Sequence, residues 1–193
     1  MQYPNLAPIL KNLRLLIIDV DGVLTAGGII YNTAGQEQKI FDVKDGLGIV
    51  MLGGLGIQTA IISGRESEIV ERRAAELRID YVLQGYPIKL PAYEKLKKMT
   101  SLQDSAIGFI GDDLIDLDVM RYVGLAVAPA DAHPAVKKIA HYVCRHRGGS
   151  GAVREIVDLI IAFRLGEFGA MNYIPPIILE HWQDVVWERE KEK

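Results

Sequence analysis

Short apolar runs alternate with helical patterns along most of this chain, and this alternation constrains the fold more than any other feature. Six runs rich in β-branched residues are apolar on both faces, which is typical of strands buried in a parallel sheet. They cover residues 13–19, 59–63, 81–85, 106–112, 125–129 and 141–145. Helical patterns lie between them, most clearly at residues 66–78, 91–99, 116–123 and 151–165. The order predicts a doubly wound α/β fold.

Two segments depart from this alternation. Residues 27–43 contain two strand-like runs around the turn sequence NTAGQE, which predicts a β-hairpin inserted directly after the first strand. We therefore expect one core domain over residues 1–166, including the hairpin. Residues 167–193 combine the Pro175-Pro176 break with apolar side chains, and are predicted to form a tail that docks on another surface.

Composition narrows the possible partners of the chain. A net charge of -3 over 193 residues gives no field that would attract nucleic acid or an anionic membrane. No apolar stretch approaches the roughly 18 residues of a membrane span. Cys144 is the only cysteine, so it is interpreted as a core residue in a reducing compartment, and we expect a cytoplasmic protein. The four histidines lack the spacing of metal ligands.

Polar residues follow three of the predicted strands, at 19–21, 63–65 and 111–113. Ligands of doubly wound sheets bind at the carboxyl ends of the strands, so these groups should meet in one crevice. The first pair, Asp19 and Asp21, follows a run of apolar residues. A carboxylate can attack phosphorus and form an aspartyl-phosphate. A bridging magnesium ion would remove the repulsion between the two anions.

The stretch around these aspartates suggests a role for each residue. Asp19 is predicted to be the nucleophile and a metal ligand. Asp21 lies on the same side of an extended chain, and is predicted to act as general acid and then general base, with its carbonyl toward the metal. Gly22 permits a sharp turn beside the phosphate, and Thr25 is predicted to steady Asp21 through a hydrogen bond.

The sequence DVDGVLT at residues 19–25 resembles the first signature of the haloacid dehalogenase superfamily of phosphatases. In that resemblance, Ser63 and Gly64 of IISGRES correspond to the second motif, which binds the phosphate. Lys89 of QGYPIKL stands where the third motif has a lysine that offsets the phosphoryl charge. Taken alone, a serine such as Ser63 is more often a turn residue, and a lysine such as Lys89 is more often a solvated surface residue.

GDDLID at residues 111–116 resembles the fourth signature of the superfamily. The resemblance implies Asp112 as a Mg²⁺ ligand, with Asp113 and Asp116 as a further ligand or as supports of the site. The alternative interpretation of Asp113 and Asp116 is that they cap helices. RGGSGAVRE at residues 147–155 lacks the ending of a P-loop, and its glycines are interpreted as a strand-to-helix turn, with substrate contact as the alternative.

The spacing of the motifs bears on the substrate. Relatives in the superfamily often insert a cap domain between motifs, but Ser63 follows Asp19 by 44 positions and Lys89 follows Ser63 by only 26. We therefore expect the haloacid dehalogenase type of sheet with no cap domain. An uncapped site is open to water, and a neighbouring subunit is the simplest way to close it. Hairpins from several subunits can pair into a shared sheet.

Further stretches, including FDVKDGLGI and APADAHP, look like the small capless phosphatases that hydrolyse 3-deoxy-D-manno-octulosonate 8-phosphate, a precursor of lipopolysaccharide. This resemblance implies a homotetramer with shared active sites, in which the tail reaches a neighbouring subunit. It places Lys44, Asp45, Gly46 and Arg65 near the sugar acid, where Lys44 or Arg65 can pair with its carboxylate. The alternative is that both cations serve surface ion pairs.

Two departures and two rival functions stay open. Lys44 stands where many members of that subfamily have arginine, and the tail ends in WQDVVWEREKEK rather than a short glycine-rich end. One rival is a phosphatase of another sugar phosphate, such as a nine-carbon keto-deoxy sugar acid phosphate. The other is a non-catalytic assembly or regulatory protein that keeps the fold.

Overall fold

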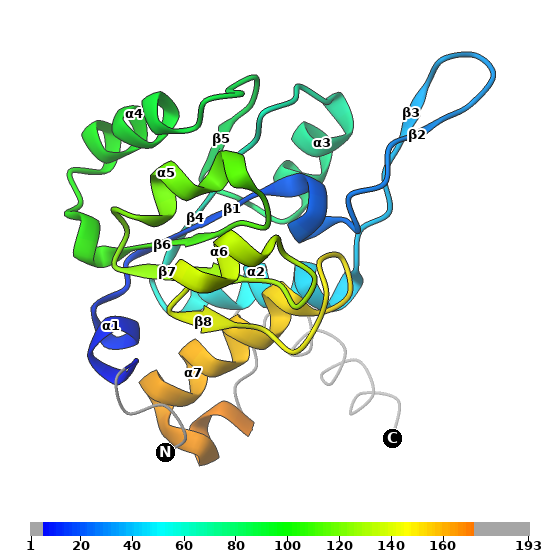
Figure 1. The fold of residues 1–193 in the computed structure, drawn as a ribbon. Helices are drawn as coiled ribbons and strands as arrows, with labels where there is room; N and C mark the ends of the chain where they lie inside the picture. The colour runs from blue at the N-terminus through cyan, green and yellow to red at the C-terminus, as the bar shows by residue number, and fades with distance from the viewer. Residues whose placement is uncertain (1–5, 172–193) are drawn as a thin grey trace, which may run out of the picture.

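A central parallel sheet lies between two layers of helices in the computed structural model, which describes residues 6–171 (Figure 1). The sheet has six strands in the order β5-β4-β1-β6-β7-β8, and every neighbouring pair is parallel. The strands are β1 (Leu15–Ile18), β4 (Gln58–Ile62), β5 (Tyr81–Leu83), β6 (Ile107–Ile110), β7 (Leu125–Ala128) and β8 (Tyr142–Val143). All six predicted strands and the doubly wound α/β class are confirmed.

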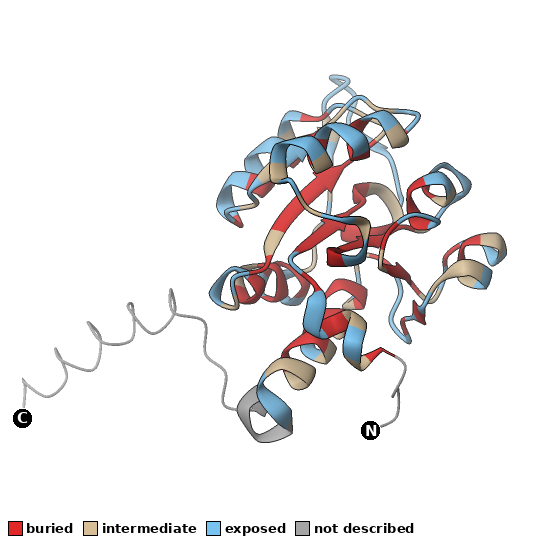
Figure 2. Ribbon diagram, turned by 90° about the vertical axis from the view of Figure 1, so that its left-hand side faces the viewer, coloured by how far each residue is buried: buried red, intermediate tan, exposed pale blue. Residues whose placement is uncertain are grey.

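The side chains of β1 alternate between the two layers, as an extended chain requires. Leu15 and Ile17 pack in the cluster that includes helices α4, α5 and α6. Leu16 and Ile18 pack in the cluster that includes α1, α2, α3 and α7. All four side chains are fully buried, and Figure 2 shows the sheet as the buried centre of the molecule.

The seven helices of the described chain include three that lie outside the four predicted helical ranges, α1, α2 and α6. The helices are α1 (Ala7–Asn12), α2 (Val43–Gly54), α3 (Glu68–Glu76), α4 (Leu90–Thr100), α5 (Leu117–Met120), α6 (Pro134–Ile139) and α7 (Ala152–Met171). Of these three, α1 and α6 have six residues each and a proline in the first turn. Six residues are too few for a helical period to stand out in sequence.

The inserted hairpin consists of β2 (Ile30–Tyr31) and β3 (Glu37–Gln38), and its tip projects away from the sheet (Figure 1). The Asn32 side chain organises the turn by accepting hydrogen bonds from the backbone of Ala34 and Gln36 at 3.0 and 2.9 Å. The predicted hairpin is confirmed, although its antiparallel strands are only two residues long.

No cap domain is present within residues 6–171. The hairpin and α2 are the elements between β1 and β4, and α3 and β5 are those between β4 and Lys89. The backbone of α7 departs from helical geometry at Gly166 (φ 76°, ψ 165°), where the predicted core domain ends. Most of the predicted tail, residues 172–193, lies outside the described residues. None of the helices in the described part is long and apolar enough to cross a membrane.

The direction in which successive strands are added to the sheet reverses at β1. The chain moves from β1 outward to β4 and β5, and then returns to the other side of β1 with β6. Such a switch point opens a crevice at the carboxyl ends of the strands. Asp19 directly follows β1 and Ser63 directly follows β4. Asp112 lies two residues after the end of β6.

Candidate active site

Asp19 begins a wide turn at the carboxyl end of β1. Its backbone N–H donates to the carbonyl of Ile110 at 3.0 Å, which extends the pairing of β1 with β6 by one residue. Its carboxylate Oδ1 accepts from the backbone N–H of Val20 at 2.7 Å, and the turn closes where Thr25 N–H donates to the Val20 carbonyl at 3.0 Å. Asp19 is therefore held on a rigid strand end rather than on a mobile loop.

Gly22 lets Asp112 approach this turn. Gly22 has φ 97°, and a Cβ atom at this position would lie 2.0 Å from the Asp112 Oδ2 atom. On the other side, a Cβ atom on Gly148 would lie 1.8 Å from the Gly22 carbonyl oxygen. The loop before α7 thus packs directly against the turn that carries Asp19 and Asp21. This contact gives the glycines of RGGSG a packing role.

The carboxylates of Asp19, Asp112 and Asp116 gather in one cluster, with ligand oxygens within 4.8 Å of one another. Asp19 is 4% exposed and Asp116 is fully buried. Three neighbouring carboxylates in the protein interior need compensation by cations and hydrogen bonds.

Lys89 supplies one buried cation to this cluster. Its Nζ atom lies 2.8 Å from Asp19 Oδ1 and 2.6 Å from Asp116 Oδ1, and its side chain is 0% exposed. Burial alone would lower the pKa of Lys89, but the charges of Asp19 and Asp116 outweigh it and raise the pKa. Lys89 therefore stays protonated, against its alternative interpretation as a solvated surface residue.

Asp116 supports the site through both of its oxygens. Oδ1 binds Lys89, and Oδ2 accepts from the backbone N–H groups of Asp112 and Asp113 at 2.9 and 3.1 Å. Asp113 accepts from Leu114 N–H at 2.7 Å and so caps the following short turn. Both side chains are engaged in organising this loop, whereas the Asp112 carboxylate is left facing Asp19.

Burial raises the pKa of Asp19 to about 7, although the charge of Lys89 opposes this effect. Burial, together with the charges of Asp19 and Asp116, raises the pKa of Asp112 to about 7 as well. The Asp112 Oδ1 atom is buried without a hydrogen-bond partner in the described part of the chain. A divalent cation would satisfy this oxygen and the excess negative charge, and Mg²⁺ prefers carboxylate oxygens. The residues present therefore fit a magnesium ion.

Ser63 lies at the same edge of the sheet, beside the turn that follows β1. Ile18 of β1 pairs with Ile61 of β4, so Ser63 follows β4 at the level where the turn begins. Ser63 is 3% exposed, and its hydroxyl accepts from the backbone N–H of Arg65 at 3.3 Å. Ser63 and Gly64 therefore follow β4 at the same edge of the sheet at which Asp19 follows β1.

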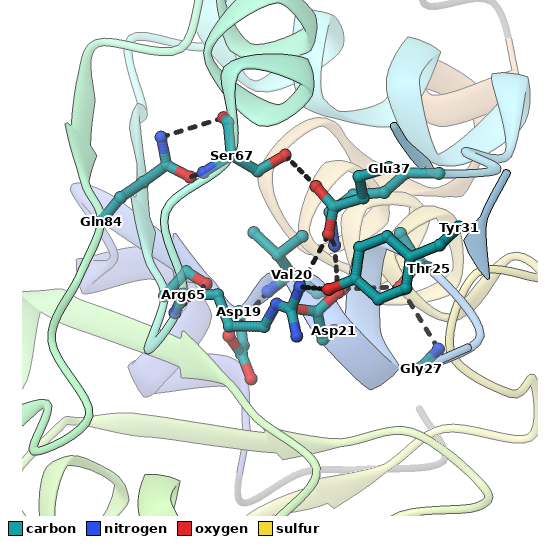
Figure 3. A network of polar contacts seen from close by, with 12 residues as sticks. Asp19, Val20, Asp21, Thr25, Gly27, Tyr31, Glu37, Arg65, Ser67 and Gln84 are labelled. Atoms are coloured by element: carbon teal, nitrogen blue, oxygen red, sulfur yellow. Dashed lines mark hydrogen bonds and ion pairs between the residues drawn. The ribbon is translucent and has the colours of Figure 1, made fainter. Parts of the chain in front are cut away.

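The carboxylate of Asp21 has a different partner from the predicted one. Its Oδ1 atom lies 2.6 Å from the Nζ atom of Lys39. The Thr25 hydroxyl instead donates to the Val20 carbonyl at 3.3 Å and accepts from Gly27 N–H at 3.2 Å (Figure 3). The prediction that Thr25 hydrogen-bonds Asp21 is therefore wrong, because the hydroxyl is used to close the turn itself.

Two of the predicted substrate contacts, Lys44 and Arg65, are accessible. Arg65 Nη2 donates to Glu37 at 2.9 Å, and its side chain is 38% exposed (Figure 3). Lys44 is exposed and lies at a cavity of about 520 Å³ whose lining includes Arg154 and Asp158 of α7. The structure thus brings Arg65, but not the Lys44 side chain, into the polar network around Asp21.

Asp45 and Gly46 serve the packing of helices. Asp45 is 1% exposed, and its carboxylate accepts from the backbone N–H groups of Gly151 and Arg154 at 3.1 and 2.8 Å, at the beginning of α7. A Cβ atom on Gly46 would lie 2.4 Å from Arg73 Nη2 of α3. The prediction that the Asp45 side chain contacts substrate is corrected, because its buried carboxylate holds α7.

Sequence reasoning missed Glu37 and Lys39, which the hairpin places against the core. Glu37 contacts Arg65 and the Ser67 hydroxyl, and Lys39 contacts Asp21. One feature of the sequence could have indicated them. Glu37 and Lys39 have opposite charges and are separated by one residue, so in an extended chain their side chains point to the same side. The partner residues are 18 to 30 positions away along the chain, and no local pattern identifies them.

Comparisons with known proteins agree with this arrangement. Residues 87–156 match a family described as haloacid dehalogenase-like hydrolase. The chain is 50% identical over 150 residues to 3-deoxy-D-manno-octulosonate 8-phosphate phosphatase of Yersinia pestis, covering 78% of this chain and 80% of the relative. A Y. pestis crystal structure of that name gives a TM-score of 0.83 at 44% identity, covering 88% of this chain and 94% of the other.

A second structural relative carries ligands. It is the Moraxella catarrhalis 3-deoxy-D-manno-octulosonate 8-phosphate phosphatase in complex with a magnesium ion, a phosphate ion and a KDO molecule. Its TM-score is 0.80 at 40% identity, and the match covers 82% of this chain and 91% of the other.

Proposed function

The chain belongs to the haloacid dehalogenase-like hydrolases, and we propose that it hydrolyses 3-deoxy-D-manno-octulosonate 8-phosphate to the free sugar acid and phosphate. The family resemblance seen in the four motifs is confirmed. The observation that most supports the activity is the buried cluster of Asp19, Asp112 and Asp116 around Lys89 at the switch point of the sheet. A non-catalytic protein that merely kept the fold would gain nothing from this costly burial of charge.

The reaction proceeds in two displacements at phosphorus. Asp19 Oδ2 has no hydrogen-bond partner among the described residues, whereas Oδ1 is held by Val20 and Lys89, so Oδ2 is the attacking oxygen. The P–O bond to the sugar breaks, and Asp21 donates its proton to the leaving oxygen. Water then attacks the phosphorus of the aspartyl-phosphate and gives its proton to Asp21, which releases phosphate and restores the Asp19 carboxylate.

Asp19, Asp112 and the backbone carbonyl of Asp21 would hold a Mg²⁺ ion, which would offset charge on the transferring phosphoryl group. Asp116 contributes indirectly, because its oxygens fix Lys89 and the amides of the loop that carries Asp112. Hydrogen bonds and ion pairs within the protein hold these groups in place, and electrostatic stabilisation of phosphoryl transfer depends on such fixed groups.

Lys89, Ser63 and Gly64 bind the phosphate. Lys89 places a fixed positive charge beside the attacking carboxylate, and its burial makes that charge effective. The Ser63 hydroxyl accepts only a 3.3 Å hydrogen bond from Arg65 N–H, so its proton is available for a phosphate oxygen.

Arg65 is the best-placed cation for the carboxylate of the sugar acid. It lies at the edge of the site, and its side chain is 38% exposed. Lys44 and Gly46 reach the sugar only if the neighbouring subunit brings the substrate toward α2.

The active form is a homotetramer with shared active sites. The hairpin and the residues after it expose apolar side chains, including Tyr31 at 58%, Ile40 at 74% and Val43 at 77%. Burying such a patch against other copies would be favourable, and subunits would then cover the uncapped site. The tail, residues 167–193, takes part by docking on a neighbour, and the protein acts in the cytoplasm, supplying the sugar acid for lipopolysaccharide.

Phosphate release from a panel of substrates tests this function. The panel contains the octulosonate 8-phosphate, a nine-carbon keto-deoxy sugar acid 9-phosphate and glucose 6-phosphate, each with and without Mg²⁺. We expect kcat/KM for the octulosonate ester to exceed that of the others by at least about tenfold. A preference for either competitor would overturn the substrate, and failure of every ester, together with p-nitrophenyl phosphate, would overturn the reaction.

A further inference from the structure

The outgoing arm of the hairpin, formed by β3 and the residue after it, places two charged residues against polar groups of the core. Lys39 Nζ lies 2.6 Å from Asp21 Oδ1. Two residues earlier, Glu37 Oε1 lies 2.9 Å from Arg65 Nη2, and its Oε2 accepts from the Ser67 hydroxyl at 2.6 Å. The same arm therefore contacts the turn after β1 and the loop after β4.

These contacts form a closed ring of four alternating charges. Lys39 Nζ lies 3.5 Å from Glu37 Oε1, and Arg65 Nε lies 3.9 Å from Asp21 Oδ2, which closes the ring between the hairpin and the core. Figure 3 shows Arg65 extending toward Asp21, with Tyr31 and Glu37 of the hairpin at the same end of its side chain. Each oxygen of Asp21 thus has its own cation, one from the hairpin and one from the core.

Burial distinguishes this ring from ordinary surface ion pairs. The Lys39 side chain is 2% exposed, although it belongs to a hairpin that projects from the protein, and Glu37 is 17% exposed. Exposed pairs contribute little, because water and salt screen them. A buried cation loses that screening and strongly favours the geometry in which its carboxylate partner lies beside it.

The hairpin also needs these contacts for its own position. Its strands pair over only two residues each, and a two-stranded hairpin is marginally stable by itself. The ring ties the base of the hairpin to Asp21, Arg65 and Ser67. The position of the hairpin and the orientation of the Asp21 carboxylate are therefore coupled.

We propose that Lys39 is a positioning residue that holds the Asp21 carboxylate in its reactive orientation, with Glu37 fixing Lys39 and the hairpin to the core. This inference rests on the proposed phosphatase function. Asp21 gives its proton to the leaving alkoxide when Asp19 attacks, and it takes a proton from water when the aspartyl-phosphate is hydrolysed. Both transfers depend on the direction of one carboxylate, so Lys39 affects both. The hairpin becomes part of the active site of its own chain.

Lys39→Met is the informative variant, because it removes the ammonium and keeps a long apolar stem. On the octulosonate ester, whose alkoxide must be protonated, we expect kcat to fall about 10–100-fold and KM to change less than about threefold. On p-nitrophenyl phosphate the leaving group needs no proton, so formation of the aspartyl-phosphate stays fast. We expect a burst of nitrophenolate close to one equivalent per active site, followed by slow turnover.

A kinetic double-mutant cycle separates positioning from general support of the fold. If Lys39 acts through Asp21, adding Lys39→Met to Asp21→Asn should change the rate less than about threefold, whereas independent effects would multiply. Lys39→Arg keeps the charge and should recover at least about tenfold of the loss on the octulosonate ester. Lys98→Met, at an exposed position of α4, is the matched control and should behave as the wild type.

Glu37→Gln is a second, milder variant that leaves the ammonium in place. It should lower kcat in the same direction as Lys39→Met but less strongly, and thermal unfolding of both metal-free variants gives a readout independent of turnover. Equal losses on the two phosphate esters without a burst, multiplicative effects in the cycle, or wild-type kcat in a folded Lys39→Met protein would each overturn the proposal. Inactivity of the wild type on all esters would instead count against the phosphatase function itself.

Discussion

Asp116 and Lys89 form a fully buried ion pair, with 2.6 Å between Asp116 Oδ1 and Lys89 Nζ and with both side chains 0% exposed. The pair joins the loop after β6 to the segment before α4, on opposite sides of the nucleophile strand. Because Asp116 Oδ2 also binds the amides of Asp112 and Asp113, one side chain connects the lysine to the metal-ligand loop. The buried ion pair between Asp116 and Lys89 therefore also holds the loops of the site together.

Asp116→Ala should destabilise the protein severely. Removing one member of a buried pair leaves uncompensated charge and unsatisfied amides, so we expect the free energy of unfolding to drop by about 3–5 kcal/mol. Equilibrium urea denaturation measures this change. Asp118→Ala, whose side chain is 61% exposed, should change the same quantity by less than about 0.5 kcal/mol. Similar stabilities for the two variants would contradict the framework role of Asp116.

Asp19→Asn should abolish turnover and leave the fold intact. The amide keeps the shape of the side chain but is not a nucleophile, so kcat should fall by at least about a thousandfold. Circular dichroism and the Tm of the metal-free protein check that the fold is preserved. Turnover within tenfold of the wild type would exclude an aspartyl-phosphate at Asp19.

Magnesium binding should weaken as the pH falls. The pKa values of Asp19 and Asp112 are both raised to about 7, first by burial, so below that pH protons compete with the ion for these oxygens. Affinity should drop by up to about tenfold per pH unit for each proton displaced. Titration calorimetry in buffers of different ionisation enthalpy should detect proton release on binding at pH 6 and little at pH 8.5. Affinity and heat that do not vary with pH would contradict these pKa shifts.

Asp112→Asn should stabilise the metal-free protein at high pH. The pKa of Asp112 lies at about 7 in the folded state and near 3.8 when unfolded, so between these values the folded state binds more protons. Its contribution to stability therefore decreases as the pH rises through this window and is least favourable above pH 7. The neutral amide removes that cost, worth about 1–3 kcal/mol.

The matching measurement is Tm against pH in the presence of a chelator. The advantage of Asp112→Asn should be greatest at pH 8 and vanish only well below the unfolded-state value of 3.8, where the wild-type carboxyl is protonated in both states. Added Mg²⁺ should raise the Tm of the wild type but not of the variant. A variant less stable than the wild type at pH 8 would contradict burial as the source of the shift.

The sequence patterns predicted most of the fold, because the local spacing of apolar residues identifies its strands and most of its longer helices. Residues 15–18 are apolar at every position, which marks a strand buried on both faces. The motifs also identified Asp19 and Asp112 beyond the ends of β1 and β6 and Lys89 directly before α4, and the fold brings the three together. Local sequence patterns did not predict the role of a side chain whose partner is distant in sequence. Asp45 caps a helix that begins more than 100 residues later, and Lys39 binds a carboxylate across the base of the hairpin.

Gly148→Ala should damage the site through backbone packing alone. The new Cβ atom would lie 1.8 Å from the Gly22 carbonyl oxygen, and this neighbour is backbone that cannot rotate away. Either the loop before α7 or the turn carrying Asp21 must move. Overpacking of this kind costs about 1–3 kcal/mol, and a shift of about 1 Å in the turn would lower kcat by about a hundredfold.

Gly53→Ala is the matched control, because Gly53 lies in α2 with nothing within 4 Å of the added Cβ atom. Gly53 is the next-to-last residue of α2, so this exchange should stabilise the protein by at most about 1 kcal/mol and leave kcat unchanged. Urea denaturation and phosphate release on both variants give the comparison. If the two alanines had the same effect on kcat, the contact between Gly148 and Gly22 would have no part in holding the catalytic turn. Opposite signs for the two changes in stability would show that the close approach at Gly148, and not the loss of a glycine, determines the outcome.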